Sequence, residues 1–70
     1  MMKTETLKIT GMTCQMCVKH VTKAFQGVAG VTDVIVHLEP GTATVTYNPE
    51  IANHKAFETA VAEAGYAVSG

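Results

Sequence analysis

Three segments of the chain alternate polar and apolar residues, which is the pattern of a half-buried β-strand. They are Thr4–Ile9, Val34–Leu38 and Thr42–Tyr47. The turn residues Glu39-Pro40-Gly41 separate the second segment from the third, so these two are expected to pair as a hairpin. A fourth segment, Tyr66–Val68, is long enough for a short last strand.

Two further segments repeat apolar residues at helical spacing. The first helix is expected from about Met16 to Gln26 and ends at Gly27, and the second runs from about Asn53 to Ala64 and ends at Gly65. The apolar stripes consist of Val18, Val21, Phe25 and Val28 in the first helix and of Phe57, Ala60, Val61 and Ala64 in the second.

The order of these elements is β-α-β-β-α-β. Each β-α-β half needs a crossover, and right-handed crossovers place both helices on the same face of the sheet. The sequence therefore predicts an α+β fold, a ferredoxin-like sandwich in which an antiparallel four-stranded sheet carries two helices on one face. Seventy residues suffice for one small domain, residues 1–70, with a modest core.

The only two cysteines, Cys14 and Cys17, lie where the first strand pattern gives way to the first helix. Cys14 is expected in the loop and Cys17 in the first helical turn, with Thr13 or Gln15 in the cap region. Amides and the dipole at a helix start lower the pKa of a thiol and favour the thiolate. Two thiolates that converge at the surface form a soft chelating pair, suited to Cu(I).

Other chemistry is open to such a pair. A thiol of low pKa at a helix start is also the reactive group of thiol–disulfide oxidoreductases, although this chain is short for a thioredoxin-like domain and differs in element order. Structural zinc requires four ligands, and no histidine stands at a zinc-finger spacing from the cysteines. Two ordinary buried thiols are the third interpretation, which the helix-start position disfavours.

Charge narrows the choice of partner. The net charge is −1 and no basic-and-aromatic surface pattern is present, so nucleic acid is not expected as a partner. Residues 1–26 carry four lysines and one glutamate, whereas residues 27–70 carry one lysine and five acidic residues. The cysteines thus lie in the basic half, which suits an acidic docking partner but equally describes a solvated basic helix face.

No stretch of the chain resembles a signal peptide or reaches transmembrane length, so we expect a cytoplasmic protein without direct membrane insertion. In a small cytosolic domain, two cysteines are more often metal-binding or redox-active than a structural disulfide.

The segment Gly11-Met12-Thr13-Cys14-x-x-Cys17, placed after a short strand in a β-α-β-β-α-β chain, resembles the heavy-metal-associated domain. The likeness covers essentially all seventy residues, includes the pair Gly65-Tyr66, and is strongest to small bacterial copper chaperones. It implies that Cys14 and Cys17 bind Cu(I) and that Met12 belongs to the core. It also implies either a cytosolic copper chaperone or the detached metal-binding domain of a copper-transporting P-type ATPase.

We accordingly expect a carrier and not an enzyme. Its partner would be the metal-binding domain of a copper-transporting P-type ATPase or a copper-responsive regulator, reached by thiolate ligand exchange. Cys14 on the loop is expected to meet the partner first, and Cys17 in the helix to retain the metal. A monomer is expected, with a copper-bridged dimer as an alternative, and a thiol–disulfide redox protein remains the rival from another class.

Residues around the motif refine this interpretation. Relatives that handle zinc, cadmium or lead tend to carry an acidic residue where this chain has Thr13, so the resemblance favours Cu(I). The ring of Tyr66 would shield the metal or tune the thiolates, or it would only cap the core. Met16 is expected to be an exposed methionine, with a weak third ligand as the alternative.

The three histidines are expected on the surface. His20 follows Cys17 by one helical turn and could approach a metal shared between two molecules. His37 and His54 have no such neighbour, and none of the three has a partner at helical or strand spacing that makes a second site.

Overall fold

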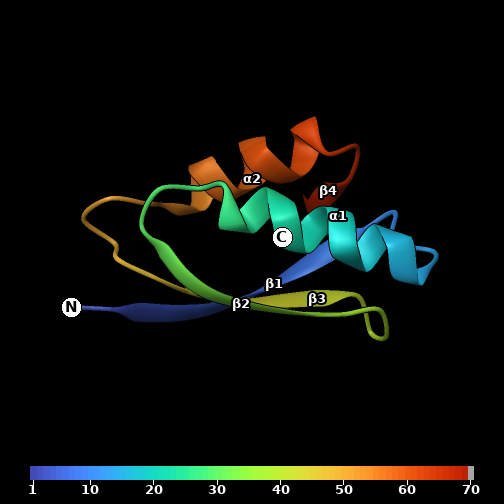
Figure 1. The fold of residues 1–70 in the computed structure, drawn as a ribbon, viewed down its shortest axis with the longest axis horizontal. Helices are drawn as coiled ribbons and strands as arrows, with labels where there is room; N and C mark the ends of the chain where they lie inside the picture. Colours follow the sequence, from blue (N-terminus) through green and yellow to red (C-terminus); the bar gives the residue numbers. More distant parts are fainter. Residues whose placement is uncertain (70) are drawn as a thin grey trace.

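A computed structural model of the chain describes residues 1–69. The elements are β1 (Lys3–Thr10), α1 (Gln15–Gln26), β2 (Val31–His37), β3 (Thr42–Tyr47), α2 (His54–Glu63) and β4 (Ala67–Ser69). The strands form one antiparallel sheet in the order β2-β3-β1-β4, and both helices cover the same face of it (Figure 1). The predicted ferredoxin-like architecture is confirmed. Neither helix in this described range is long and apolar enough to cross a bilayer.

The second strand differs from its prediction at both ends. It starts at Val31, before the predicted start at Val34, because a register shift between Val31 and Asp33 lets Val31 still pair with Tyr47. It stops at His37, whose partner Thr42 is the first residue of β3, so the chain has to turn in between. Leu38 therefore lies in the turn and not in the strand, contrary to the prediction.

The core lies between the sheet and the two helices. Phe57 of α2 stands at its centre, with its ring centroid 5.6 Å from that of Phe25 on α1 and 4.8 Å from that of Tyr47 on β3, the latter edge-on. Such tilted and edge-on pairs add to the free energy of apolar burial. The buried residues include apolar positions of β1 and β3 and the centres of both helical stripes, whereas Val34 and Val36 of β2 are only half-buried. They are Leu7, Ile9, Val21, Phe25, Ala43, Val45, Tyr47, Ala52, Phe57 and Val61.

A polar cluster ties the start of α2 to β1. His54 Nδ1 lies 2.9 Å from Glu5 Oε1, and the Tyr47 hydroxyl donates to Glu5 Oε2 at 3.1 Å. His54 Nε2 also approaches Glu58 Oε2 at 3.4 Å. The hydrogen bond to Glu5 raises the pKa of His54, and the same bond lowers the pKa of Glu5. The contact with Glu58 joins two residues one turn apart on α2.

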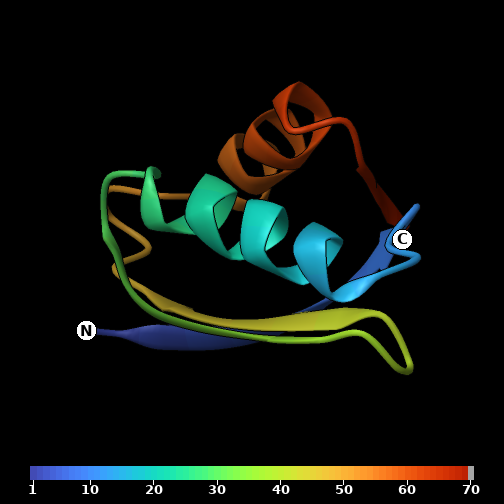
Figure 2. The ribbon, with the colours of Figure 1, turned by 45° about the vertical axis from the view of Figure 1, so that its right-hand side comes forward.

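The pairing of β1 with β4 brings the last strand beside the end of β1, at one edge of the sheet. Ile9 lies opposite Val68 and Thr10 opposite Ala67. In Figure 2 the loop after β1, in light blue, accordingly lies beside β4, in dark red, at the same end of the molecule as the start of α1. The cysteine loop and the segment that precedes β4 therefore share one end of the fold.

The core predicts a large effect for Phe57→Ala, because the ring is fully buried between two aromatic neighbours. We expect the free energy of unfolding to fall by about 3–5 kcal/mol. Urea unfolding followed by circular dichroism measures this loss. Ile51→Ala is the control, since Ile51 is 62% exposed, and should change stability by no more than about 0.5 kcal/mol. Equal losses in both variants would contradict the packing described.

The polar cluster predicts a pH-dependent effect of His54→Ala. The raised pKa of His54 contributes stability below its ordinary value of 6.5 that is lost as the pH rises through the folded pKa. The lowered pKa of Glu5 contributes stability above its ordinary value of 4.5 that is lost as the pH falls through the folded pKa. The difference in unfolding free energy between the native chain and the variant should therefore be largest between these two values.

Urea unfolding across the pH range measures this difference. His37→Ala, which removes an exposed histidine from the edge strand β2, is the control. If the loss of unfolding free energy in His54→Ala varies with pH in the same way as the loss in His37→Ala, the Glu5 contact contributes nothing.

Candidate metal centre

The two cysteines lie at the start of α1. Cys14 is the N-cap, with an extended backbone (φ −156°, ψ 169°), and Cys17 lies in the first turn, where its amide donates to the Cys14 carbonyl at 3.0 Å. The cap is thus Cys14 itself and not Thr13 or Gln15. The sulfur atoms are 3.2 Å apart, and both thiols are free. Cys14 is exposed, whereas Cys17 is half-buried.

The electrostatic environment makes Cys17 acidic. A hydrogen bond from the Tyr66 hydroxyl is the largest of the effects that lower the pKa of Cys17 to about 6, followed by the Thr13 backbone and the Cys14 side chain, against a smaller cost of desolvation. The same contact raises the pKa of Tyr66 to about 12. Cys17 is therefore a thiolate at neutral pH. The prediction that the pKa of Cys17 is lowered was right. The hydroxyl of Tyr66, 49 positions along the chain, lowers this pKa more than the backbone at the helix start does.

Gly11 lies against the ring of Tyr66. Gly11 has a positive φ of 95°, a backbone conformation that favours glycine, and a Cβ atom there would only touch Tyr66 Cδ1 at 3.4 Å. Tyr66 also packs against the core. It therefore caps the core and lowers the pKa of Cys17 as well, so the alternative in which it only caps the core was wrong, and the shielding of a metal by its ring stays a prediction.

The structure also places the other residues of interest. Met12 is half-buried and packs against the core, as expected, and Met16 is 58% exposed. His20 is exposed on α1, but its Nδ1 lies 3.4 Å from Tyr66 Oη. Sequence reasoning missed this contact, because nothing in the local pattern links residues 20 and 66. Among residues 1–69 no group of three or more His, Cys, Asp and Glu side chains is arranged to hold a metal ion.

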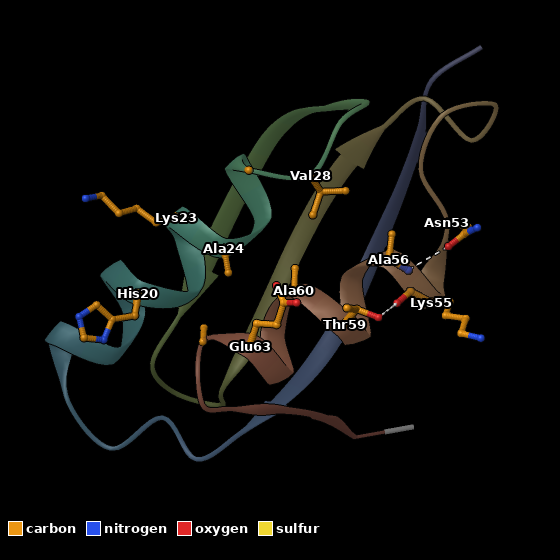
Figure 3. A pocket seen from close by; sticks show the side chains of 12 residues that line it. His20, Lys23, Ala24, Val28, Asn53, Lys55, Ala56, Thr59, Ala60 and Glu63 are labelled. Atoms are coloured by element: carbon orange, nitrogen blue, oxygen red, sulfur yellow. Dashed lines mark hydrogen bonds between the residues drawn. The ribbon is translucent and has the colours of Figure 1, made fainter.

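A groove of about 920 Å³ runs between α1 and α2 on the surface away from the sheet. Figure 3 shows His20, Lys23 and Ala24 on one side and Thr59, Ala60 and Glu63 on the other. Small side chains on the facing turns leave this space open. Neither cysteine lines the groove. His20 lines it and also contacts Tyr66, which lies near the thiols.

The two sulfurs form a donor pair suited to a soft cation. A zinc–sulfur bond is about 2.3 Å long, so a single ion of similar size can contact both atoms at their separation of 3.2 Å. Thiolates select Cu(I) and other soft metals over hard cations such as Mg²⁺. Because Cys14 is exposed at this helix start, an ion held there would stay accessible to a further ligand.

A β-α-β-β-α-β domain with two free thiols converging at the start of its first helix belongs to the class of small thiolate metal-binding domains. More specifically, the chain belongs to the heavy-metal-associated domain family, which matches residues 6–67.

Relatives within longer proteins include copper and mercury proteins. The chain is 48% identical over 63 residues to the copper-transporting ATPase 2 of Rhizobium meliloti, a match that covers 90% of this chain and 8% of the ATPase. It is 45% identical over 60 residues to the mercuric reductase of Serratia marcescens, covering 86% of this chain and 13% of the reductase. The chain thus spans only a small part of these relatives.

Solved structures of similar size share the fold almost completely. Oxidized MerP from Ralstonia metallidurans CH34 has a TM-score of 0.94 and 38% identity, covering 99% of this chain and 96% of that one. A copper-ion-binding protein from Bacillus anthracis has a TM-score of 0.92 and 30% identity, covering 99% and 97%. A CopZ metallochaperone has a TM-score of 0.91 and 31% identity, covering 96% and 100%.

The geometry predicts that Tyr66→Phe raises the pKa of Cys17, since the variant loses the largest of the effects that lower it. In a Cys14→Ser background the ultraviolet absorbance of the thiolate reports Cys17 alone. We expect its titration to shift to higher pH when Tyr66→Phe is added, with the circular dichroism of the fold unchanged. An identical titration curve in both proteins would exclude Tyr66 as the cause of the low pKa of Cys17.

Proposed function

We propose that residues 1–70 act as one unit that binds Cu(I) through Cys14 and Cys17 and carries it to a copper-transporting P-type ATPase. The observation behind this proposal is the pair of free sulfurs 3.2 Å apart at a helix start, one of them a thiolate at neutral pH. The chain would act as a carrier and not as an enzyme. Family membership and the similarity to a copper-transporting ATPase and a CopZ metallochaperone support this role.

Residue 13 supports Cu(I) as the cargo. A carboxylate before the first cysteine would add a hard oxygen ligand for zinc-like ions, and this chain has Thr13 there. The Thr13 hydroxyl lies 4.0 Å from Cys17 Sγ, close to the thiols without supplying a charged ligand. Hg(II) is the metal to compare with copper, because MerP and mercuric reductases are among the similar proteins.

Transfer would proceed by ligand exchange. A thiolate of the partner joins the metal on its open side, and one of the two carrier sulfurs then leaves. Cys14 is exposed at the end of the loop, so it would meet the partner first and dissociate first. Cys17 is half-buried and anchored in the helix, so it would be the last ligand to leave.

The proposed setting is the cytoplasm, where free thiols persist. The docking partner would be the metal-binding domain of the ATPase or a copper-responsive regulator, and the carrier would be monomeric, with a copper-bridged dimer as the alternative. A domain with this site would serve equally as the N-terminal metal-binding domain of an ATPase. The segment of the Rhizobium meliloti ATPase that matches this chain is 8% of the length of the ATPase.

Anaerobic titration of the reduced protein with Cu(I), against a competing chelator, tests the proposal. We expect stoichiometric binding that resists the chelator and is lost in the Cys14→Ser, Cys17→Ser double variant. Met16→Leu is the matched control, since Met16 is exposed and directly precedes Cys17 in the sequence, and it should bind copper like the native chain. Weak binding that the double variant retains would refute the proposal. A parallel titration with Hg(II) ranks the two metals.

The rival function is thiol–disulfide exchange, which the short distance between the sulfurs also permits. An insulin-reduction assay without copper distinguishes the two functions. We expect no turnover above a control that lacks the protein. Catalytic turnover that depends on both cysteines, combined with weak copper binding, would establish the redox function instead.

A further inference from the structure

The strand β2 forms one edge of the sheet. β3 lies on one side of it, and no strand of residues 1–69 lies on the other. The amide and carbonyl groups along the free side of an edge strand can pair with a further strand. β4 forms the other edge but consists of only three residues, and a short edge strand is a poor template for pairing. β2 is therefore the edge that can accept an additional strand.

The last five residues of β2, Asp33–His37, form a regular strand. They pair one-to-one with β3, from Asp33 opposite Thr46 to His37 opposite Thr42, and the register shift at the start of β2 comes before them. An irregularity of this kind protects an edge from further pairing. Here it protects only the first part of β2, so the backbone of Asp33–His37 stays available.

Three adjacent apolar residues lie in the middle of this edge. Ile35 is 51% exposed on the outer face of the sheet. Val34 and Val36, on the helix face, pack against the core but stay half-buried. Their partners on β3, Val45 and Ala43, are fully buried. A second strand alongside β2 would therefore remove further apolar surface from water.

The order of the side chains along this edge is self-complementary. When two identical strands pair antiparallel and are centred on Ile35, the residue two places before the centre lies opposite the residue two places after it. Asp33 of one copy then faces His37 of the other, and the reverse pair forms on the far side of the centre. Ile35 faces Ile35, and Val34 faces Val36.

Both kinds of pair favour association. An imidazole N–H donates to a carboxylate, and polar pairs of opposite character stabilise neighbouring strands, as do pairs of β-branched side chains. The pattern also selects the register. A shift by one residue would place Asp33 opposite Val36, and would set side chains of the outer face against side chains of the helix face.

We propose that two copies of the chain associate through the free edge of β2, with Ile35 facing Ile35 and Asp33 facing His37, so that one antiparallel sheet continues across the dimer. The cysteine loop follows β1, which pairs with β4 at the opposite edge. The association therefore needs neither thiol nor metal, and it does not rest on the proposed function. Two short strands bury less surface than a stable interface requires, so we expect a monomer in dilute solution and a dimer at high concentration.

Sedimentation equilibrium of the reduced, metal-free chain, from micromolar to millimolar concentration, tests the association. We expect a reversible monomer–dimer equilibrium, unchanged in the Cys14→Ser, Cys17→Ser variant. Ile35→Lys should raise the dissociation constant about tenfold or more, because two like charges then face each other at the centre. Ile51→Lys is the matched control. It adds the same charge at an isoleucine that is 62% exposed outside the sheet, and it should keep the native dissociation constant.

An exchange of the two polar residues tests the register. His37→Asp places two carboxylates opposite each other on both sides of the centre, and should raise the dissociation constant about tenfold. The double variant Asp33→His, His37→Asp again sets an imidazole opposite a carboxylate at both places. It should return the constant to within about threefold of the native value. A double variant that dimerises as weakly as His37→Asp alone would contradict this register.

Other outcomes would overturn the proposal as a whole. They are a native chain that stays monomeric at millimolar concentration, and a dimer that Ile35→Lys and Ile51→Lys weaken equally. A dimer that the Cys14→Ser, Cys17→Ser variant loses would depend on the thiols and would also exclude pairing through β2. The Cu(I) titration is decided separately, because Ile35→Lys should bind copper like the native chain.

Discussion

The antiparallel pairing of β1 with β4 is the constraint on which the candidate metal centre depends. It consists of three residue pairs, reinforced by the Thr10 hydroxyl, which donates to the Ala67 carbonyl at 3.3 Å. Continuing this register by one step places Gly11 opposite Tyr66, where the tyrosine ring lies against the glycine. Because the cysteines follow Gly11 directly, this short pairing brings a phenol from the end of the chain to the thiols near its start.

The consequence is that two chemically identical thiols differ in their surroundings. Cys14, as the N-cap, is exposed and lies on the loop, whereas Cys17 is half-buried and has a phenol, a backbone amide and a neighbouring thiol around it. In the proposed transfer, a symmetric chelate would release either sulfur with equal ease. The unequal exposure would give the exchange a direction, because a partner thiolate can approach a metal beside the exposed Cys14 more readily than beside the half-buried Cys17.

Local patterns predicted the elements of this fold and the position of the cysteines, because strand and helix periods and the Cys14–Cys17 spacing are local in the sequence. The polar contacts could not be predicted in this way. His20 and Tyr66 are 46 residues apart, and Glu5 and His54 are 49 apart. Each contact depends on how the strands pair and where the helices pack. The register shift that carries Val31 into β2 has the same origin, since it is set by the partner strand.

His54 and Cys17 contribute to stability with opposite dependence on pH. His54 stands at the start of α2, and Tyr66, which lowers the pKa of Cys17, stands just beyond the end of α2. The raised pKa of His54 contributes stability that is lost as the pH rises through its folded value. The lowered pKa of Cys17 contributes stability that is lost as the pH falls through about 6, so it increases while the contribution of His54 declines. The two trends oppose each other near neutrality. A metal that binds the thiolates and not the thiols would extend the contribution of Cys17 to lower pH, because it competes with protons for the same sulfur atoms.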